Sequence, residues 1–182
     1  MRGWSVVLFD TYGDVEEGAE SYIENAALKA RALHAQLRTS GMNAEVLADD
    51  SGLEVYVLDG RPGVLSARYG GDTSWAQRRA LLLAELGDAR DRRARFVCAL
   101  HHIDSLGRET SVCAELLGVI PMQERGMGGF SYDAIFCETA GGPTFAELSN
   151  VEKNDRSHRA RAAALLVEAV RANEAKTGST GT

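Results

Sequence analysis

Cysteine is scarce in this sequence, which has only three among its 182 residues. Cys98, Cys113 and Cys137 are odd in number and far apart, and no CxxC pair occurs, so neither a disulfide framework nor a thiolate zinc site is expected. His101 and His102 lie close to Cys98, but neighbouring residues of a strand point to opposite faces, which argues against a metal site there. We therefore expect a reducing compartment, the cytoplasm.

The sequence also lacks an excess of positive charge. Lys and Arg number 20 against 26 Asp and Glu, which gives a formal net charge of −6. This balance provides no electrostatic reason to expect a nucleic acid or an anionic membrane as a partner. No run of about 18 apolar residues is present, and residues 1–10 lack the basic start and long apolar core of a signal peptide, so neither a spanning helix nor a leader is expected.

The chain is long enough for one sizeable domain, and no internal repeat or linker divides it. We expect a single α/β domain over residues 1–173, with two lobes around a groove, and a disordered tail at 174–182. Capping boxes at Ser21/Glu24 and Ser149/Glu152 mark helix starts. Apolar periodicity and turn residues predict a strand at 4–9, a helix at 21–38, strands at 46–48 and 53–58, a helix at 74–86, strands at 94–103, 110–120 and 134–137, and a helix at 157–172.

The stretch VLADDSGLEV, residues 46–55, places two adjacent carboxylates between apolar runs. Magnesium prefers one or two carboxylates together with water and substrate phosphates, and a carboxylate can also orient or deprotonate a water. Asp49 and Asp50 are therefore candidate metal and catalytic residues. The structural alternative is a capped turn, in which Asp49, Asp50 and Ser51 satisfy backbone donors.

Three other segments supply candidate partners for these carboxylates. Asn25 and Lys29 are four residues apart and share a face of the first helix, where a lysine can serve as a point charge for phosphate. Glu17, before this helix, is a candidate metal ligand or simply an acidic residue near a helix start. In GGFSYD, Phe130 offers an aromatic face and Asp133 a polar end; the alternative is a strand with one ring in the core.

The densest cationic patch is EKNDRSHRARA, residues 152–162, which crosses an expected helix break. Its donors include Lys153, His158 and Arg159, more donor capacity than a solvated helix face needs. Donors of these types can read the oxygen edge of a purine, because a 6-oxo group accepts a hydrogen bond where a 6-amino group donates one.

Five runs together resemble the inosine/xanthosine triphosphate pyrophosphatases, enzymes that remove deaminated purine nucleotides. They occur in that family's order and spacing over about residues 15 to 170, and are SYIENAALKARA (21–32), LADDSGLEVYVLDGRPGVLSARYGG (47–71), RFVCAL (95–100), GGFSYDAIF (128–136) and FAELSNVEKNDRSHRARA (145–162). The resemblance implies Mg²⁺-dependent hydrolysis of ITP, dITP or XTP to the monophosphate and pyrophosphate. It also implies an elongated mixed β-sheet with flanking helices, two lobes around a central substrate cleft, and a homodimer.

The resemblance assigns roles to individual positions of this sequence. Asp50 matches the general base and metal-binding aspartate, with Asp49 and Glu17 as further metal ligands. Substrate contacts are implied for Ser51, Lys29, Phe130, Ser131, Tyr132, Asp133, Lys153, His158 and Arg159.

The sequence departs from the family in several places. Ser131 stands where glycine is usual and Ala134 where proline is usual, and in residues 73–86 Arg78 or Arg79 replaces the usual Asn and Lys pattern. The family's opening strand and its T/S-x-N-x-x-K phosphate loop have no counterpart, so we expect an N-terminally truncated sheet. A catalytically impaired nucleotide-binding relative is therefore one alternative. A second is a haloacid-dehalogenase-like hydrolase with Asp10 as nucleophile, because SVVLFDTYGD resembles that nucleophile strand.

Overall fold

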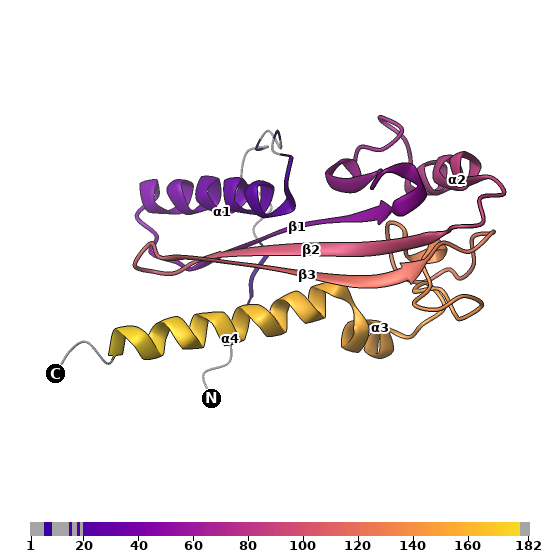
Figure 1. The fold of residues 1–182 in the computed structure, drawn as a ribbon. Coiled ribbons are helices and arrows are strands. Elements are labelled where there is room, and N and C mark those ends of the chain that lie inside the picture. The colour runs from indigo at the N-terminus through magenta and orange to yellow at the C-terminus, as the bar shows by residue number, and fades with distance from the viewer. Residues whose placement is uncertain (1–5, 9–14, 16–17, 19, 179–182) are drawn as a thin grey trace.

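The computed structural model describes residues 6–8, 15, 18 and 20–178 (Figure 1). Its helices and strands are α1 (Tyr22–Thr39), β1 (Val46–Val55), α2 (Trp75–Leu86), β2 (Arg93–Ile103), β3 (Glu109–Val119), α3 (Asn150–Arg156) and α4 (His158–Gly178). Three short 3₁₀ turns, η1 (Tyr56–Leu58), η2 (Gly63–Leu65) and η3 (Asp133–Ile135), lie between them. Within these ranges, no helix is both long and apolar enough to cross a membrane.

The three strands form an antiparallel sheet in the order β1-β2-β3, with α1 on one face and α4 on the other (Figure 1). Strand alternation divides the apolar residues of β2 between the two helices. Val97 and Ala99 pack with Tyr22 and Ala26 of α1. Cys98 and Leu100 face the other way and pack with Ala162 and Leu166 of α4. Because both faces are covered, the central strand is almost wholly buried.

A larger apolar cluster lies at the end of the sheet where α2 and the chain around η3 close over the strands. Phe96 of β2 is central to it, with its ring 4.2 Å from that of Phe136 and 6.2 Å from that of Phe145. The long strands thus connect two separately packed halves, which agrees with the expected two-lobed α/β architecture and its flanking helices.

The helix starts that the sequence predicted are confirmed. Ser74 and Ser149 each cap a helix through a reciprocal capping box, with Gln77 and Glu152 as the partners. The Ser21 side chain accepts a hydrogen bond from the Glu24 amide at the start of α1. These caps satisfy backbone donors that the first helical turn leaves without partners.

Several expected boundaries were wrong. The two short strands at 46–48 and 53–58 are one strand, β1, which passes straight through the aspartates instead of turning there. Residues 134–137 form no strand; the first two belong to η3, and Cys137 makes only isolated bridges to Val119 and Thr144. The strand pairings described are all antiparallel, so the sheet over residues 20–178 is not mixed.

The two ends of the chain also differ from expectation. Residues 6–8 of the strand expected at 4–9 have no regular secondary structure, and the rest of that strand lies outside the described residues. α4 continues to Gly178, beyond its expected end at 172 and into the segment expected to be a disordered tail.

Gly52 of β1 is enclosed on the α1 face of the sheet. A Cβ added there would lie 2.4 Å from the Gly63 carbonyl oxygen, 2.7 Å from the Tyr22 hydroxyl and 2.8 Å from Ser66 Oγ. The backbone of η2 can therefore approach β1 closely only because this position has no side chain. Ser66 Oγ uses that proximity to accept a hydrogen bond from the Leu53 amide at 2.9 Å.

We predict that Gly52→Ala lowers the free energy of unfolding by roughly 1–3 kcal/mol, because the added methyl group must displace backbone in a packed region. Urea unfolding followed by circular dichroism measures the change. Gly18→Ala is the matched control, since a Cβ at that position meets nothing within 4 Å. Equal stability of the two variants would contradict the close approach of η2.

Candidate active site

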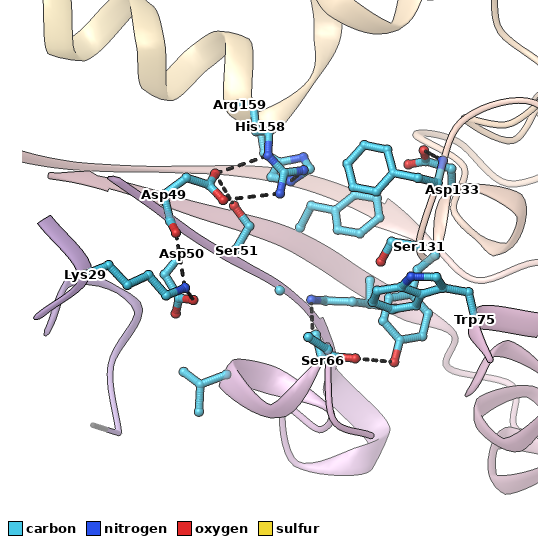
Figure 2. A pocket seen from close by; sticks show the side chains of 17 residues that line it. Lys29, Asp49, Asp50, Ser51, Ser66, Trp75, Ser131, Asp133, His158 and Arg159 are labelled. Atoms are coloured by element: carbon cyan, nitrogen blue, oxygen red, sulfur yellow. Dashed lines mark hydrogen bonds and ion pairs between the residues drawn. The ribbon is translucent and has the colours of Figure 1, made fainter. Parts of the chain in front are cut away.

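A cavity of about 200 Å³ lies between the two halves of the molecule (Figure 2). Its walls come from α1, β1, η2, the start of α2, β2, the loop at residues 130–133 and the start of α4. The residues predicted from sequence that line it are Lys29, Asp49, Asp50, Ser51, Phe130, Ser131, Tyr132, Asp133, His158 and Arg159. Lys153 is outside the lining but contacts Asp133 and Phe130. Glu17 lies outside the described residues.

Asp49 and Asp50 point to opposite faces of β1 (Figure 2). They are consecutive residues of an extended strand, so their side chains alternate. Asp50 meets side chains of α1, whereas Asp49 meets side chains of β2 and α4. The two carboxylates therefore have separate environments and separate partners.

Asp50 is buried and held by two residues of α1. Lys29 Nζ lies 2.7 Å from Asp50 Oδ1 and also donates to the Asp49 carbonyl oxygen at 3.3 Å. Asn25 Nδ2 donates to Asp50 Oδ2 at 3.4 Å. Lys29 and Asn25 reach the same carboxylate because residues four apart share a helix face. The orientation of Asp50 is thus set by the packing of α1 on the sheet.

Asp49 is the acceptor for three side chains on the other face. Its Oδ2 accepts from Ser51 Oγ at 2.9 Å, Cys98 Sγ at 3.3 Å and Arg159 Nε at 3.1 Å, and Arg159 Nη2 is 3.4 Å from Oδ1. Burial by itself would raise the pKa of the Asp49 carboxyl, but the Arg159 charge and these hydrogen bonds hold it below its ordinary value. The same burial, together with the Asp49 charge, raises the pKa of the Cys98 thiol to about 12. Cys98 is therefore a neutral donor to an ionised carboxylate.

The loop at residues 130–133 is closed by Asp133, whose Oδ2 accepts from the Phe130 amide at 2.7 Å and forms an ion pair with Lys153. Phe130 remains 54% exposed. Two cations lie near its ring: Lys153 Nζ at 4.4 Å and Arg159 Cζ at 5.1 Å from the centroid. An exposed aromatic face bordered by donors is suited to stacking a planar heterocycle.

Ser131 has a positive φ of 58°, a conformation that favours glycine. This explains structurally why a glycine suits the position. Arg79 of α2 supports the strained backbone, since its Nη1 donates to the Ser131 carbonyl at 2.7 Å while its Nη2 pairs with Glu124 at 2.7 Å. Of the two arginines considered from sequence, Arg79 is the one that contacts this loop.

Tyr132 has a different position from its neighbour Phe130. It is buried in the main apolar cluster, where its hydroxyl donates to the Ser66 carbonyl at 3.0 Å and its ring packs edge-on against Trp75 at 5.5 Å. The structural alternative was a strand with one ring in the core: the buried ring is correct for Tyr132, but the segment forms a turn and not a strand. Its ring anchors the loop and leaves Phe130 as the exposed aromatic face.

His158 begins α4 and is buried against Phe96, with ring centroids 4.6 Å apart and planes 17° from parallel. Burial, followed by the charge of Arg159, lowers the pKa of His158 to about 3. The imidazole is therefore neutral at physiological pH. Its Nε2 is 3.5 Å from Arg159 Nη1, and its buried Nδ1 has no hydrogen-bond partner among the described residues. Buried polar atoms are usually paired, so such an atom marks a position that a ligand can satisfy.

A metal ion at this site would depend mainly on Asp50. Within the described ranges, no group of three or more His, Cys, Asp or Glu side chains is arranged to hold one. A carboxylate has about four lone-pair positions, so accepting from Lys29 and Asn25 is compatible with binding a cation as well. One carboxylate is also enough for magnesium when phosphates supply other ligands. Asp49 is less suitable, because Arg159 and two further donors already occupy it.

The family model described as "Ham1 family" matches residues 3–169. This chain belongs to the Ham1 family. Membership gives no support to the haloacid-dehalogenase-like alternative, whose nucleophile, Asp10, lies outside the described residues.

Similar Ham1-family proteins include curated enzymes and a solved structure. The dITP/XTP pyrophosphatase of Staphylococcus epidermidis is 41% identical over 159 residues, which cover 85% of this chain and 77% of that protein. The dITP/XTP pyrophosphatase of Thermus thermophilus is 41% identical over 172 residues, covering 92% of this chain and 80% of that one. The structure of the Staphylococcus aureus Ham1 protein matches with a TM-score of 0.79 and 38% identity, over 88% of this chain and 82% of the other.

Sequence reasoning missed several residues of this Ham1-family site. Ser66, Trp75 and Phe96 line the cavity, and none of them was singled out from the sequence, although Phe96 lies in the RFVCAL run of the family resemblance. Ser66 belongs to a run that carried the family resemblance, yet its role depends on the approach of η2 to β1 and on the Tyr132 hydroxyl. Cys98 was considered only as a metal ligand, whereas it is a donor to Asp49.

The lowered pKa of His158 predicts how stability depends on pH. Between the ordinary histidine value of 6.5 and about 3, the unfolded chain binds a proton at this residue that the folded chain does not. Stability contributed by the neutral ring is thus fully present above pH 6.5 and is lost as pH falls, by up to about 1.4 kcal/mol per pH unit. Urea unfolding between pH 6 and pH 4 should show a flatter dependence for His158→Asn than for the parent protein.

The same prediction has a direct spectroscopic check. The NMR signal of the His158 ring, identified by its absence in His158→Asn, should not titrate between pH 5 and pH 8 while the protein is folded. A midpoint near the ordinary histidine value would show that the ring is not buried as described.

Proposed function

We propose that this Ham1-family protein hydrolyses deaminated purine nucleoside triphosphates, namely ITP, dITP and XTP, to the monophosphate and pyrophosphate. The observation that carries the proposal is one cavity lined both by Asp50 with Lys29 and by Phe130 with His158 and Arg159. The dITP/XTP pyrophosphatase activity named for its relatives supports the same reaction. Water is added across the anhydride between the α and β phosphates, and the pyrophosphate departs.

The base end of the cavity accounts for the purine. The exposed face of Phe130 stacks the heterocycle, and Asp133 with Lys153 holds the loop that presents this ring. The Arg159 guanidinium only donates hydrogen bonds, and neutral His158 retains one ring proton. These donors favour a 6-oxo purine, because a 6-amino group would meet them with hydrogens of its own.

The phosphate end accounts for the chemistry. Asp50 is fixed by Lys29 and Asn25, so it can orient an attacking water and accept its proton with little reorganisation. Lys29 places a positive charge beside the same carboxylate, where it can also contact phosphate oxygens. We propose Mg²⁺ as cofactor, held by Asp50 with Glu17 as a further candidate ligand. When bound, Mg²⁺ neutralises phosphate charge and polarises the bond that breaks.

We also propose that the protein acts as a homodimer in a reducing cytoplasm. All three cysteines, Cys98, Cys113 and Cys137, are free thiols in the structure. Size-exclusion chromatography with light scattering measures the oligomeric state.

The reaction itself is tested by incubating the protein with ITP and Mg²⁺ and measuring pyrophosphate. We expect pyrophosphate and IMP as products, with slower turnover of ATP and GTP. Release of orthophosphate, or faster turnover of ATP than of ITP, would refute the proposal. Binding of ITP without turnover would instead favour the alternative of a catalytically impaired relative.

Asp50→Asn should reduce kcat for ITP by at least about a hundredfold, because an amide cannot accept the proton of the attacking water. Pyrophosphate release at saturating ITP measures the effect. The matched control, Asp72→Asn, alters an exposed aspartate outside the cavity lining and should leave kcat unchanged. Full activity of Asp50→Asn would assign the chemistry to another residue.

A further inference from the structure

Asp49 has the contacts of a carboxylate that orients another side chain. Its oxygens accept hydrogen bonds from Ser51, Cys98 and two nitrogens of Arg159, all on the α4 face of β1. Asp50, the candidate metal ligand, points to the α1 face. Oδ2 of Asp49 already accepts from three donors and its Oδ1 lies 3.4 Å from Arg159 Nη2, so most of the lone-pair positions that a magnesium ion would need are occupied.

Asp49 holds Arg159 through two of the three guanidinium nitrogens. Nε and Nη2 contact the two oxygens of Asp49 at 3.1 and 3.4 Å. A guanidinium held through two nitrogens has its plane and direction set by the carboxylate. The group then lies 5.1 Å from the Phe130 ring centroid, and its third nitrogen, Nη1, is 3.5 Å from His158 Nε2.

The same contacts determine which ring nitrogen of His158 carries the proton. Arginine only donates, so the approach of Arg159 Nη1 makes His158 Nε2 the acceptor. The proton of the neutral ring is then on Nδ1, which has no partner among the described residues. Asp49 thereby orients Arg159, and Arg159 sets the tautomer of His158, so that Arg159 is the donor presented near the Phe130 ring.

We propose that Asp49 is a positioning residue for base selection, which makes the site specific for a 6-oxo purine by holding Arg159 beside Phe130 and His158, and that it is not a ligand of the metal. This deepens the proposed function and rests on it. Loss of the Asp49 charge leaves Asp50, Lys29 and Asn25 in place, so hydrolysis continues while discrimination between ITP and ATP declines.

The test compares Asp49→Asn with the parent protein in two measurements. The ratio of kcat/KM for ITP to that for ATP should fall about tenfold, because a correctly placed charged donor discriminates between purine edges by that order. The Mg²⁺ concentration for half-maximal activity should stay within about twofold of the parent value, because Asp49 acts through Arg159 and does not bind the metal. A general structural defect would lower both substrates equally and leave the ratio unchanged.

The matched control is Glu115→Gln, which removes the carboxylate of the Arg95–Glu115 pair in the same sheet, away from the cavity. Its ITP-to-ATP ratio should equal that of the parent. An unchanged ratio in Asp49→Asn would overturn the proposal. If the Mg²⁺ requirement also rises, with both substrates equally impaired, Asp49 is assigned to the metal.

A double-mutant cycle tests whether Asp49 acts through Arg159. In an Arg159→Ala background, Asp49→Asn should change the ITP-to-ATP ratio no further. A second, additive loss would mean that Asp49 contributes to selectivity independently of Arg159. If Asp49→Asn does not fold, as judged by circular dichroism, Asp49→Glu keeps the charge but displaces Arg159; a lowered ratio supports the proposal and an unchanged one overturns it.

Calorimetric binding of IMP and AMP without metal separates this proposal from the proposed function. A parent protein that does not hydrolyse ITP refutes the proposed function alone. The preference for IMP over AMP, and its loss in Asp49→Asn, then still tests the role of Asp49. Equal IMP preference in the parent and in Asp49→Asn would overturn it.

Discussion

The alternation of side chains along β1 is the constraint on which this site depends. Because β1 is extended and covered by α1 on one face and α4 on the other, two consecutive aspartates have different partners. Asp50 pairs with Lys29 of α1, and Asp49 pairs with Arg159 of α4. A turn at this point would have placed both carboxylates together. The strand instead divides them between the proposed phosphate end and the proposed base end of one cavity.

Much of the remaining structure keeps these two ends at a fixed separation. The main apolar cluster anchors Tyr132 and so positions the exposed ring of Phe130. Ser66 connects β1 to the Tyr132 hydroxyl, and Arg79 supports the positive φ of Ser131 from α2. Sites are precise when their residues belong to packed elements, and here the loop at residues 130–133 is the wall that depends on such anchors from outside itself. Burial keeps His158 neutral, so its proposed part in base recognition should not change near neutral pH.

The prediction from sequence was most accurate where local interactions decide the structure. The starts of α1, α2 and α3 follow from Ser21, Ser74 and Ser149, whose caps involve residues three positions away. It failed at β1, because aspartate, serine and glycine are unfavourable in strands by propensity and favour turns. Lysine and arginine from distant helices stabilise the extended conformation there, and no local pattern contains that information.

The sequence alone therefore determined the helix starts, the α/β class and which residue types gather in the site, because these depend on short-range periodicity and on the family resemblance. Only the tertiary structure decided how those residues are paired. Asp49 and Arg159 are separated by 110 positions, and their contact exists because α4 packs across the face of the sheet opposite α1. Strand alternation places the side chains of Asp49 and Asp50 on opposite faces of β1, and the packing of α1 and α4 on those faces determines their partners.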